Sequence, residues 1–306
     1  MNQRVKESPR DGRPLLYGEV LFDRFPDDAS VLGGAPFNVA WHLQGFGLQP
    51  LLISAVGQDT QGEKVLQTMC DWGMDCQGIQ IDPIHPTGVV NITLNNGQPT
   101  FTIVAEQAYD FILPEAVEDI IHRESISLLY HGSLISRSQI SRDTLSLLQQ
   151  RINKPVFVDV NLREPWWENS IVDELLKRAS WLKINDAELV KLTADDNALQ
   201  PLQHAARNMF DRYQLDLLIV TCGARGAFIV GKDEMIDGEP VMVKEVADTV
   251  GAGDAFSAVT LLGLIKGWSY ADTLQRALQF ASQLCTVRGA TLQDKVVYTD
   301  LLQQWQ

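Results

Sequence analysis

The sequence predicts an α/β fold in which helices cover both faces of a mostly parallel sheet. Short apolar runs such as LLISAVG at 51–57 recur along the chain, and segments with helical periodicity lie between most of them. The runs are continuous rather than alternating in polarity, as in strands that are buried on both faces. The 306 residues, 45% of them hydrophobic, allow one large domain of this class or two of ordinary size.

The predicted elements follow in order from the start of the chain. The run PLLYGEVLF at 14–22 predicts the first strand, and APFNVAWHLQGFG at 35–47 predicts a helix that ends at a glycine. The strand at 51–57 is followed by a helical pattern at 62–74. A dense apolar segment at 254–265, free of helix breakers, predicts a buried helix. Further strands are predicted at 127–133, 155–161, 180–185, 216–223 and 226–231.

One region interrupts this alternation. The segment 87–106 contains two runs of β-forming residues around NNGQ, a combination typical of a hairpin. Together with the connection at 23–34, it predicts a small β-layer that acts as a lid, for which we take the boundaries 23–34 and 87–110. The alternative is an ordinary antiparallel edge of the main sheet. A lid matters for function because closing over a site excludes water.

Composition argues against several kinds of partner. The chain has 25 Lys and Arg against 39 Asp and Glu, a net charge of −14 and a pI near 4.7. Nucleic acids and anionic membranes require basic surface, so we expect neither as a main partner. The first residues lack an apolar secretory segment, and no apolar run reaches the length of a membrane span. The four cysteines form no CxxC pair, so we expect free thiols and a cytoplasmic location.

The stretch DTVGAGDAF at 248–256 combines small residues with two carboxylates just before the predicted buried helix. Backbone N–H groups of Gly251, Ala252 and Gly253 would be free at this helix start, where the helix dipole adds positive charge, so the turn predicts an anion hole. Asp254 cannot bind phosphate, but it would accept the proton of a hydroxyl that attacks phosphate. The helix N-terminus is expected to keep Asp254 ionised. The alternative is a structural helix cap.

A second motif, LGGAPFNVAWHL at 32–43, opens the first predicted helix. Gly33 and Gly34 would let a ligand lie against the backbone, and Asn38 offers both a donor and an acceptor. Asp23 is predicted at the end of the first strand, and ligands of open parallel sheets bind beyond the carboxyl ends of strands. The alternative is a plain transition from loop to helix.

A third polar cluster, VDVNLREPWW at 158–167, follows another predicted strand. The planar guanidinium of Arg163 suits recognition of hydroxyl or phosphate groups, with a surface salt bridge as the alternative. Other chemistries lack their motifs. The five histidines show no zinc-binding spacing, and the chain has no GxSxG nucleophile motif and no Walker glycine loop.

Two further segments suggest contacts to a nucleotide. In KINDAELV, Asn185 and Glu188 would lie on one helix face and hold hydrated Mg²⁺ near phosphates. The alternative for this pair is a cap at the helix start. In TCGARGAF, Thr221, Gly223 and Gly226 follow a strand and would contact phosphate or ribose, or else form a tight turn into the next strand.

Taken in order, GGAPFNVA and DTVGAGDAF resemble the two signatures of the PfkB (ribokinase-like) family of sugar kinases. The segments VDVNLREPWW, KINDAEL and TCGARGAF occur between them in the family's order, so the resemblance covers nearly the whole chain. It implies a single kinase domain over residues 1–306, built as a three-layer α/β/α sandwich with a small β-sheet lid. It also implies ATP-dependent transfer of the γ-phosphoryl group to a sugar or related alcohol, with Mg²⁺.

The resemblance further implies a role for each candidate residue. Asp254 would be the catalytic base, beside an anion hole formed by Gly251, Ala252 and Gly253. Contacts to the sugar would come from Asp23, Gly33, Gly34, Asn38 and Arg163. Mg²⁺ and phosphate would be organised by Asn185 and Glu188, with Glu188 as the metal-binding residue. The nucleotide would lie along Thr221, Gly223 and Gly226.

Many members of the family also bind a monovalent cation such as K⁺ beside the anion hole. On this resemblance, its ligands would be the Asp248 carboxylate and the Val250 carbonyl. Many relatives carry T-R-K-G-A after the last long helix, where this chain reads TVRGA at 286–290. That departure leaves the remaining ligands of the cation without an assignment.

The motifs favour fructose as the substrate. Ribokinases of the family typically carry a lysine after the two glycines, whereas this chain has Ala35 and Pro36, and its GGAPFN and NLREPWW resemble fructokinases. The alternative is 2-keto-3-deoxygluconate or another sugar or sugar acid, whose carboxylate would pair with Arg163. A nucleotide-binding regulatory protein without activity is a third alternative, against which an intact Asp254 argues. A homodimer formed through the lid is a further expectation.

Overall fold

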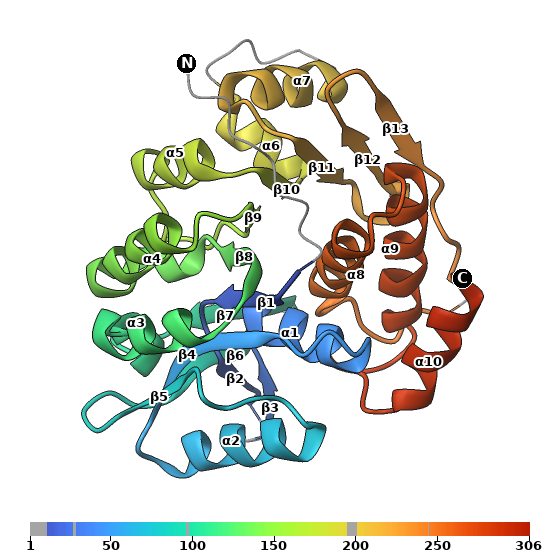
Figure 1. Ribbon diagram of the computed structural model, residues 1–306. Helices are drawn as coiled ribbons and strands as arrows, with labels where there is room; N and C mark the ends of the chain where they lie inside the picture. The colour runs from blue at the N-terminus through green and yellow to red at the C-terminus, as the bar shows by residue number, and fades with distance from the viewer. Residues whose placement is uncertain (1–10, 27–28, 96–97, 195–200, 244) are drawn as a thin grey trace.

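The computed structural model describes residues 11–26, 29–95, 98–194, 201–243 and 245–306. Within these residues, a nine-stranded sheet runs in the order β13-β12-β11-β10-β9-β8-β1-β4-β5 (Figure 1). The strands from β11 to β5 pair in parallel, and β12 and β13 extend the sheet as antiparallel strands. The strands are β1 (Arg13–Tyr17), β4 (Leu51–Gly57), β5 (Ile79–Asp82), β8 (Ile126–Gly132), β9 (Val156–Asp159), β10 (Trp181–Asn185), β11 (Leu217–Thr221), β12 (Ala227–Val230) and β13 (Met235–Gly238).

Helices cover both faces of this sheet, because successive side chains of each strand point into two separate apolar cores. In β1, Leu16 packs with one set of helices and Leu15 with the other. The first set is α1 (Ala35–Gly45), α2 (Thr60–Trp72), α8 (Ala252–Lys266), α9 (Tyr270–Leu284) and α10 (Lys295–Gln304). The second is α3 (Pro114–Arg123), α4 (Gln139–Ile152), α5 (Asn169–Arg178), α6 (Asp186–Leu192) and α7 (Leu202–Tyr213). The three-layer α/β/α sandwich predicted from the sequence is therefore confirmed (Figure 1).

The helices of the described residues are moderate in length, with 15 residues in the longest, α8 and α9. None of them combines the length and the apolar character that crossing a membrane would require. Helix α8 has the buried character expected from its sequence, since residues on all its sides pack into the protein.

The prediction of one strand over 14–22 is wrong, because the chain turns after β1. Gly18 has a φ of 153°, and a Cβ at this position would lie 2.5 Å from the ring of Pro36. Only glycine accommodates both this backbone conformation and so close an approach. The chain then leaves the central sheet, and residues 21–24 form a strand of a second sheet.

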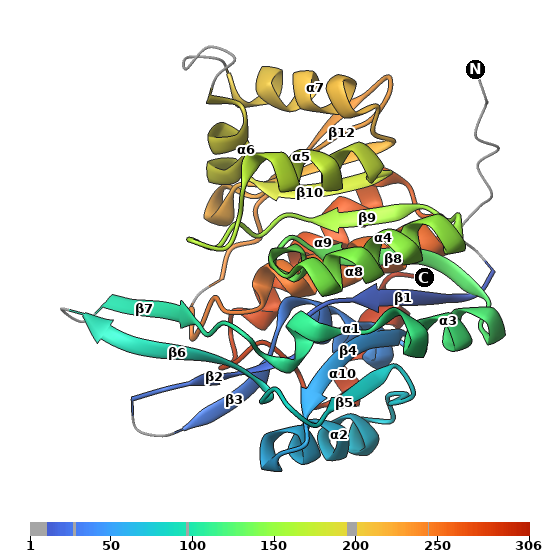
Figure 2. The same ribbon diagram turned by 90° about the vertical axis from the view of Figure 1, so that its left-hand side faces the viewer.

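The second sheet has four strands in the order β3-β2-β6-β7. Strand β2 pairs in parallel with β6, and β3 and β7 are the antiparallel outer strands. Figure 2 shows these strands extending away from the α/β body, so the alternative of an antiparallel edge of the main sheet is wrong. Residues 96–97 of the predicted NNGQ turn lie outside the described residues. The strands are β2 (Leu21–Arg24), β3 (Ser30–Gly33), β6 (Gly88–Asn95) and β7 (Gln98–Ile103).

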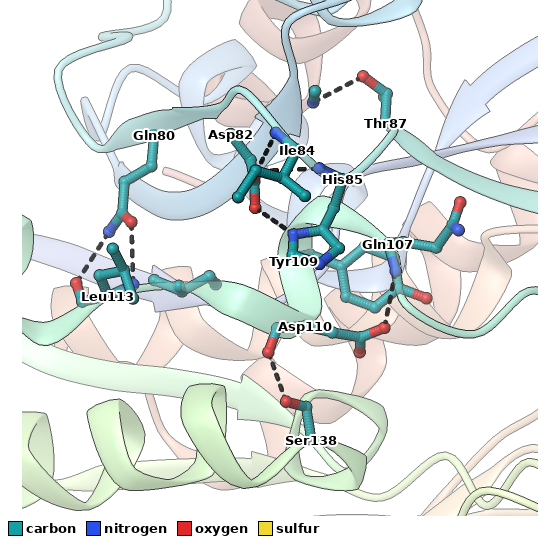
Figure 3. A network of polar contacts seen from close by, with 12 residues as sticks. Gln80, Asp82, Ile84, His85, Thr87, Gln107, Tyr109, Asp110, Leu113 and Ser138 are labelled. Carbon is teal, nitrogen blue, oxygen red and sulfur yellow. Dashed lines mark hydrogen bonds and ion pairs between the residues drawn. The ribbon is translucent and has the colours of Figure 1, made fainter.

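Polar contacts tie both ends of the β6–β7 hairpin to the α/β body (Figure 3). Before β6, Asp82 accepts a hydrogen bond from the backbone N–H of His85 at 2.9 Å and binds His85 Nδ1 at 2.8 Å. After β7, the backbone N–H of Gln107 donates to Asp110 Oδ2 at 3.1 Å. Arg137 then binds both carboxylate oxygens of Asp110, at 2.7 and 2.6 Å. The hairpin thus leaves and rejoins the body at well-fixed points.

Candidate active site

A cavity of about 740 Å³ lies at the carboxyl ends of the parallel strands, with strands of the second sheet forming part of its wall. This is the edge at which open parallel sheets bind ligands. Four of the residues predicted to contact the sugar line it: Asp23, Gly34, Asn38 and Arg163. Seven of those predicted later also line it: Asn185, Glu188, Thr221, Val250, Gly251, Gly253 and Asp254.

Five predicted residues do not line the cavity. Gly33 lies next to the lining residue Asp23, because a Cβ on Gly33 would be 3.5 Å from Asp23 Oδ2. The N–H of Ala252 faces the Thr249 carbonyl at 3.3 Å. Gly223 and Gly226 belong to the turn around the 3₁₀ segment Gly223–Arg225, which leads from β11 into β12. Both glycines therefore form a tight turn into β12, and Asp248 also lies outside the lining.

Asp254 sits in the first turn of α8, where Asn38 of α1 fixes its orientation. Asn38 Nδ2 donates to Asp254 Oδ2 at 2.7 Å. Asn38 itself is buried, and its Oδ1 atom has no hydrogen-bond partner among the described residues. The two helix starts that the sequence analysis singled out are therefore joined by one bond. The free Oδ1 is available to a hydroxyl donor in the cavity.

The expectation that the helix N-terminus keeps Asp254 ionised leaves out burial, which opposes ionisation. The pKa of Asp254 is raised to about 7, mainly by burial and also by the negative charge of Asp159. The hydrogen bond from Asn38 and the charges of Lys183 and Arg163 lower it, but they do not offset the burial. At neutral pH the carboxylate is therefore close to the midpoint of its titration, which suits a group that accepts a proton during turnover.

Gly251, just before α8, lets the chain pack closely against Ala290. Gly251 has a φ of 78°, and a Cβ there would lie 2.5 Å from Ala290. Helix α8 begins at the next residue, so the first N–H groups of the helix have no partner within it. Gly251 and Gly253 present this backbone to the cavity. Free backbone N–H groups at a helix start attract anions, and the helix dipole adds to this attraction.

Lys183, which was not predicted from the sequence, supplies a positive charge beside this turn. Its Nζ would lie 3.5 Å from a Cβ on Gly253. Lys183 Nζ donates to Asp159 Oδ1 at 2.7 Å, and both side chains are buried. Ser257 and Tyr130 donate to Asp159 Oδ2 at 2.5 and 3.1 Å. The only signal in the sequence was a lysine within the apolar run SWLKIN.

Glu19 is a second cavity-lining residue that the sequence analysis did not single out. It follows Gly18 in the segment after β1. Its backbone carbonyl packs closely against Gly34, because a Cβ on Gly34 would lie 2.7 Å from the Glu19 carbonyl oxygen. Glu19 is 4% exposed. Burial raises the pKa of its carboxyl to about 7. A glutamate within an apolar run, GEVLF, was the available signal.

Asp23 reaches the cavity from the second sheet rather than from the end of a central strand, because the chain leaves the central sheet at Gly18. Burial raises the pKa of Asp23 to about 6. The positive charge of Arg163 lowers this pKa, and the negative charge of Asp248 raises it. The predicted residue thus lines the site, but on the strand that was expected to form part of a lid.

Asn185 and Glu188 form the helix cap that was the alternative prediction. Asn185 Oδ1 accepts the N–H of Glu188 at 2.8 Å, and Glu188 Oε2 accepts the N–H of Asn185 at 3.1 Å. Glu188 Oε1 also accepts the N–H of Leu162 at 2.8 Å. Burial raises the pKa of Glu188. Among the described residues, no group of three or more His, Cys, Asp or Glu side chains forms a metal site.

Asp248 holds the glycine-rich loop in place. Its Oδ1 accepts the N–H of Val250 at 3.0 Å, and its Oδ2 accepts the N–H of Gly289 at 3.2 Å. The carboxylate therefore joins the loop before α8 to the loop after α9. Val250 is exposed, and it lines the cavity near this bridge.

Comparisons with known proteins agree with this geometry. Fructokinase of Salmonella typhimurium is 29% identical over 294 residues, which cover 90% of this chain and 94% of that protein. The crystal structure of fructokinase from Xylella fastidiosa with bound ATP has a TM-score of 0.85 at 20% identity, covering 95% of this chain and 98% of the other. A double mutant of fructokinase from Vibrio cholerae O395, with bound fructose, ADP and potassium ion, has a TM-score of 0.78 at 24% identity, covering 95% and 99%.

The solved structures support the fold, since they match almost the whole chain at low identity. The match to a family model shows more than the fold, because it depends on the amino-acid sequence. The model for the pfkB family of carbohydrate kinases matches residues 17–295, a range that includes both glycine-rich helix starts and the strand ends between them. The chain therefore belongs to the pfkB family and is an ATP-dependent sugar kinase.

Proposed function

We propose that the protein transfers the γ-phosphoryl group of ATP to a hydroxyl of fructose, with Asp254 as the general base. The observation that supports this most directly is the 2.7 Å bond from Asn38 Nδ2 to Asp254 Oδ2 at the glycine-rich start of α8. It holds a carboxylate with a pKa of about 7 beside backbone N–H groups that attract anions. A base next to an anion hole suits phosphoryl transfer to an alcohol.

In the proposed reaction, the sugar hydroxyl oxygen attacks the γ-phosphorus while the bond from this phosphorus to the β–γ bridging oxygen breaks. ADP leaves with the electron pair of the broken bond, and a carboxylate oxygen of Asp254 accepts the hydroxyl proton. The N–H groups around Gly251 and Gly253 would stabilise the negative charge on the transferred group. Lys183 would add a positive charge beside them. Thr221, Gly223 and Gly226 remain the proposed contacts to the nucleotide.

Asn185 and Glu188 fit a water-mediated contact with Mg²⁺. Each oxygen of the Glu188 carboxylate accepts one backbone N–H, and a carboxylate oxygen has a second acceptor position. Mg²⁺ usually keeps several waters in proteins, and these waters can donate to the remaining positions. When bound, the ion would neutralise negative charge on the phosphates of ATP.

Asp248 and the Val250 carbonyl remain the proposed ligands of a monovalent cation. The structure of fructokinase from Vibrio cholerae O395 with bound potassium ion supports the proposal by similarity of fold. Both oxygens of Asp248 already accept a backbone N–H, and each has a second acceptor position for a cation. Replacing potassium by tetramethylammonium in the assay is expected to lower kcat. An unchanged kcat would contradict the assignment.

The carboxylates that line the cavity favour an uncharged acceptor. Glu19, Asp23 and Asp254 are three carboxylates in its lining, and the charge of Arg163 already interacts with Asp23. A sugar acid would bring a further negative charge to this group. Relatives of this chain include a curated fructokinase, and one structurally similar fructokinase binds fructose. These observations support fructose over 2-keto-3-deoxygluconate.

ATP-dependent ADP release tests the proposal when it is measured over a panel of acceptors. The panel contains fructose, ribose, adenosine, 2-keto-3-deoxygluconate, tagatose 6-phosphate and fructose 1-phosphate. We expect the highest kcat/KM with fructose. A higher kcat/KM with 2-keto-3-deoxygluconate or a sugar phosphate would contradict the proposed substrate, and ADP release with none of the six would contradict it as well.

A further inference from the structure

Glu19 has an atom that the described structure leaves without a partner. The residue lines the active-site cavity, yet it is only 4% exposed, and its Oε2 atom forms no hydrogen bond with any described residue. Its carboxylate accepts backbone N–H groups of Glu19 itself and of Ala35, the first residue of α1. One side of the carboxylate is therefore fixed by the protein, and Oε2 is free.

The nearby cation does not neutralise Glu19. The charge of Arg137 lowers the pKa of Glu19, but Arg137 is committed to both oxygens of Asp110 at 2.7 and 2.6 Å and to the Val104 carbonyl at 2.7 Å. No described residue forms an ion pair with Glu19. Asp254, which repels it electrostatically, lines the same cavity. The free oxygen is thus an acceptor that lacks a donor.

Buried acceptors are rarely left unpaired, because losing water without gaining a donor costs free energy. Asn38 lines the same cavity, and its Oδ1 is also a buried acceptor without a partner among the described residues. Asn38 Oδ1 can only accept a hydrogen bond, and so can Glu19 Oε2 while the carboxyl is ionised. A ligand with several hydroxyl groups meets this demand, and a carboxylate does not.

The following inference rests on the proposed sugar kinase function. We propose that Glu19 Oε2 accepts a hydrogen bond from a hydroxyl of the sugar other than the hydroxyl that is phosphorylated. This contact makes Glu19 a specificity-determining residue for uncharged, polyhydroxylated acceptors. A sugar that lacks this hydroxyl leaves Oε2 unpaired in the complex. A sugar acid with its carboxylate at this position meets a second negative charge.

The test is the Glu19→Gln variant, assayed with fructose and a set of monodeoxy fructose analogues. In the variant, the amide oxygen still accepts the N–H of Ala35, but an NH₂ donor replaces Oε2. We expect the KM for fructose to rise about 10- to 100-fold, the range for a lost hydrogen bond to a charged group, and the KM for ATP to stay within about twofold. The wild type should discriminate against one deoxy analogue, and this penalty should vanish in the variant.

Tyr109→Phe provides the matched control. The Tyr109 side chain is also buried, lies beside the Arg137 guanidinium and interacts electrostatically with Glu19, but Tyr109 does not line the cavity. This variant should keep the KM for fructose and the ranking of the deoxy analogues. Thermal melting of both variants measures any structural damage, which would affect the KM for ATP and every analogue alike.

Two outcomes would overturn the inference, and they are distinguishable. If the wild type phosphorylates fructose but Glu19→Gln keeps its KM and its ranking of analogues, Oε2 binds at most an ordered water, and only the inference fails. If the wild type phosphorylates 2-keto-3-deoxygluconate and not fructose, the proposed function and the inference fail together.

Discussion

Three carboxylates in the cavity titrate close to neutral pH. Burial raises the pKa of Asp254 and of Glu19 to about 7 and the pKa of Asp23 to about 6, because a carboxylate loses hydration inside the protein. The groups proposed to bind and activate the sugar hydroxyl therefore change charge within the range in which the enzyme is assayed.

The first prediction concerns the pH dependence of kcat/KM for the sugar. A general base acts only when deprotonated, and the pKa of Asp254 is raised to about 7. We therefore expect kcat/KM to fall as the pH drops through 7 and to level off above it. The Asn38→Ala variant should move this acid limb to higher pH, because the Asn38 hydrogen bond lowers the pKa of Asp254. An acid limb at the ordinary pKa of aspartate would contradict the assignment.

The second prediction concerns Lys183. Its ammonium group lies beside the start of α8, so Lys183→Met should lower kcat and raise the KM for ATP while leaving the KM for the sugar nearly unchanged. Breaking a buried ion pair also costs about 3–5 kcal/mol of stability, because Asp159 keeps an unpaired charge. Steady-state kinetics over both substrates and thermal melting measure the two effects separately.

The double variant Lys183→Met/Asp159→Asn is the control for that experiment. Removing both charges should restore part of the stability, since no buried charge is left without a partner. The loss in kcat should remain, because the positive charge beside the anion hole is still missing. Recovery of kcat together with stability would show that Lys183 has only a structural role.

At the scale of elements, the site is assembled where two helices begin. Gly34 precedes α1 and Gly251 precedes α8, and each has a positive φ and a neighbour too close for a Cβ. These glycines let the helix starts approach the chain after β1 and the loop after α9. The bond from Asn38 to Asp254 then joins the two helices within the lining of the cavity. Glycine at both positions therefore has a steric cause.

The third prediction concerns the second sheet as a lid. Asp23 of β2 and Phe101 of β7 both line the cavity, so a bound sugar would link this sheet to the α/β body. We expect limited proteolysis within 87–106 to slow when fructose is added, by up to about 100-fold at a concentration 100 times its Kd. Mass spectrometry of the fragments gives the cleavage rate at this segment.

Asp23→Ala is the control for the lid experiment, because it removes the proposed link between the sheet and the sugar. Protection by fructose should be much weaker in this variant, and cleavage at sites elsewhere in the chain should not depend on the sugar. Equal cleavage of the wild-type hairpin with and without saturating fructose would rule out a sugar-dependent closure.

At the scale of the whole molecule, the fold class could be predicted from the sequence because the central strands are continuous apolar runs. The run at 51–57, for example, is β4 with the same bounds. The break after β1 could not be predicted, because Gly18 lies in an uninterrupted apolar run. Glycine is required at this position because of the close contact with Pro36, which is distant in sequence. Local patterns identify strands, but a change of sheet depends on packing that they do not contain.

The same limit separates the site residues that were predicted from those that were missed. Asp254 and Asn38 stand in glycine-rich helix starts, which are local signals. Lys183 and Glu19 stand in apolar runs, and their surroundings come from distant segments, such as Asp159, 24 residues before Lys183. Burial also decided the pKa of Asp254, and the extent of burial cannot be read from a helix start alone.

A homodimer through the second sheet remains a proposal for the assembled molecule. Phe25 directly follows β2 and is 38% exposed, and Val31 lies in β3 and is 42% exposed. These side chains are consistent with an apolar contact at this sheet. Light scattering during size exclusion should give twice the mass of one chain, 34.1 kDa. The mass of a single chain at micromolar concentration would contradict the proposal.

The central claim is that Asp254 takes the proton from the sugar hydroxyl, and the Asp254→Asn variant tests it most directly. The measurement is kcat for ATP-dependent phosphorylation of fructose, together with calorimetric binding of ATP and of fructose. Asp294→Asn is the matched control, because Asp294 caps α10 outside the cavity lining and asparagine caps equally well. We predict that Asp254→Asn lowers kcat by about 10²- to 10⁴-fold with both binding constants nearly unchanged. A kcat equal to that of Asp294→Asn would contradict the account.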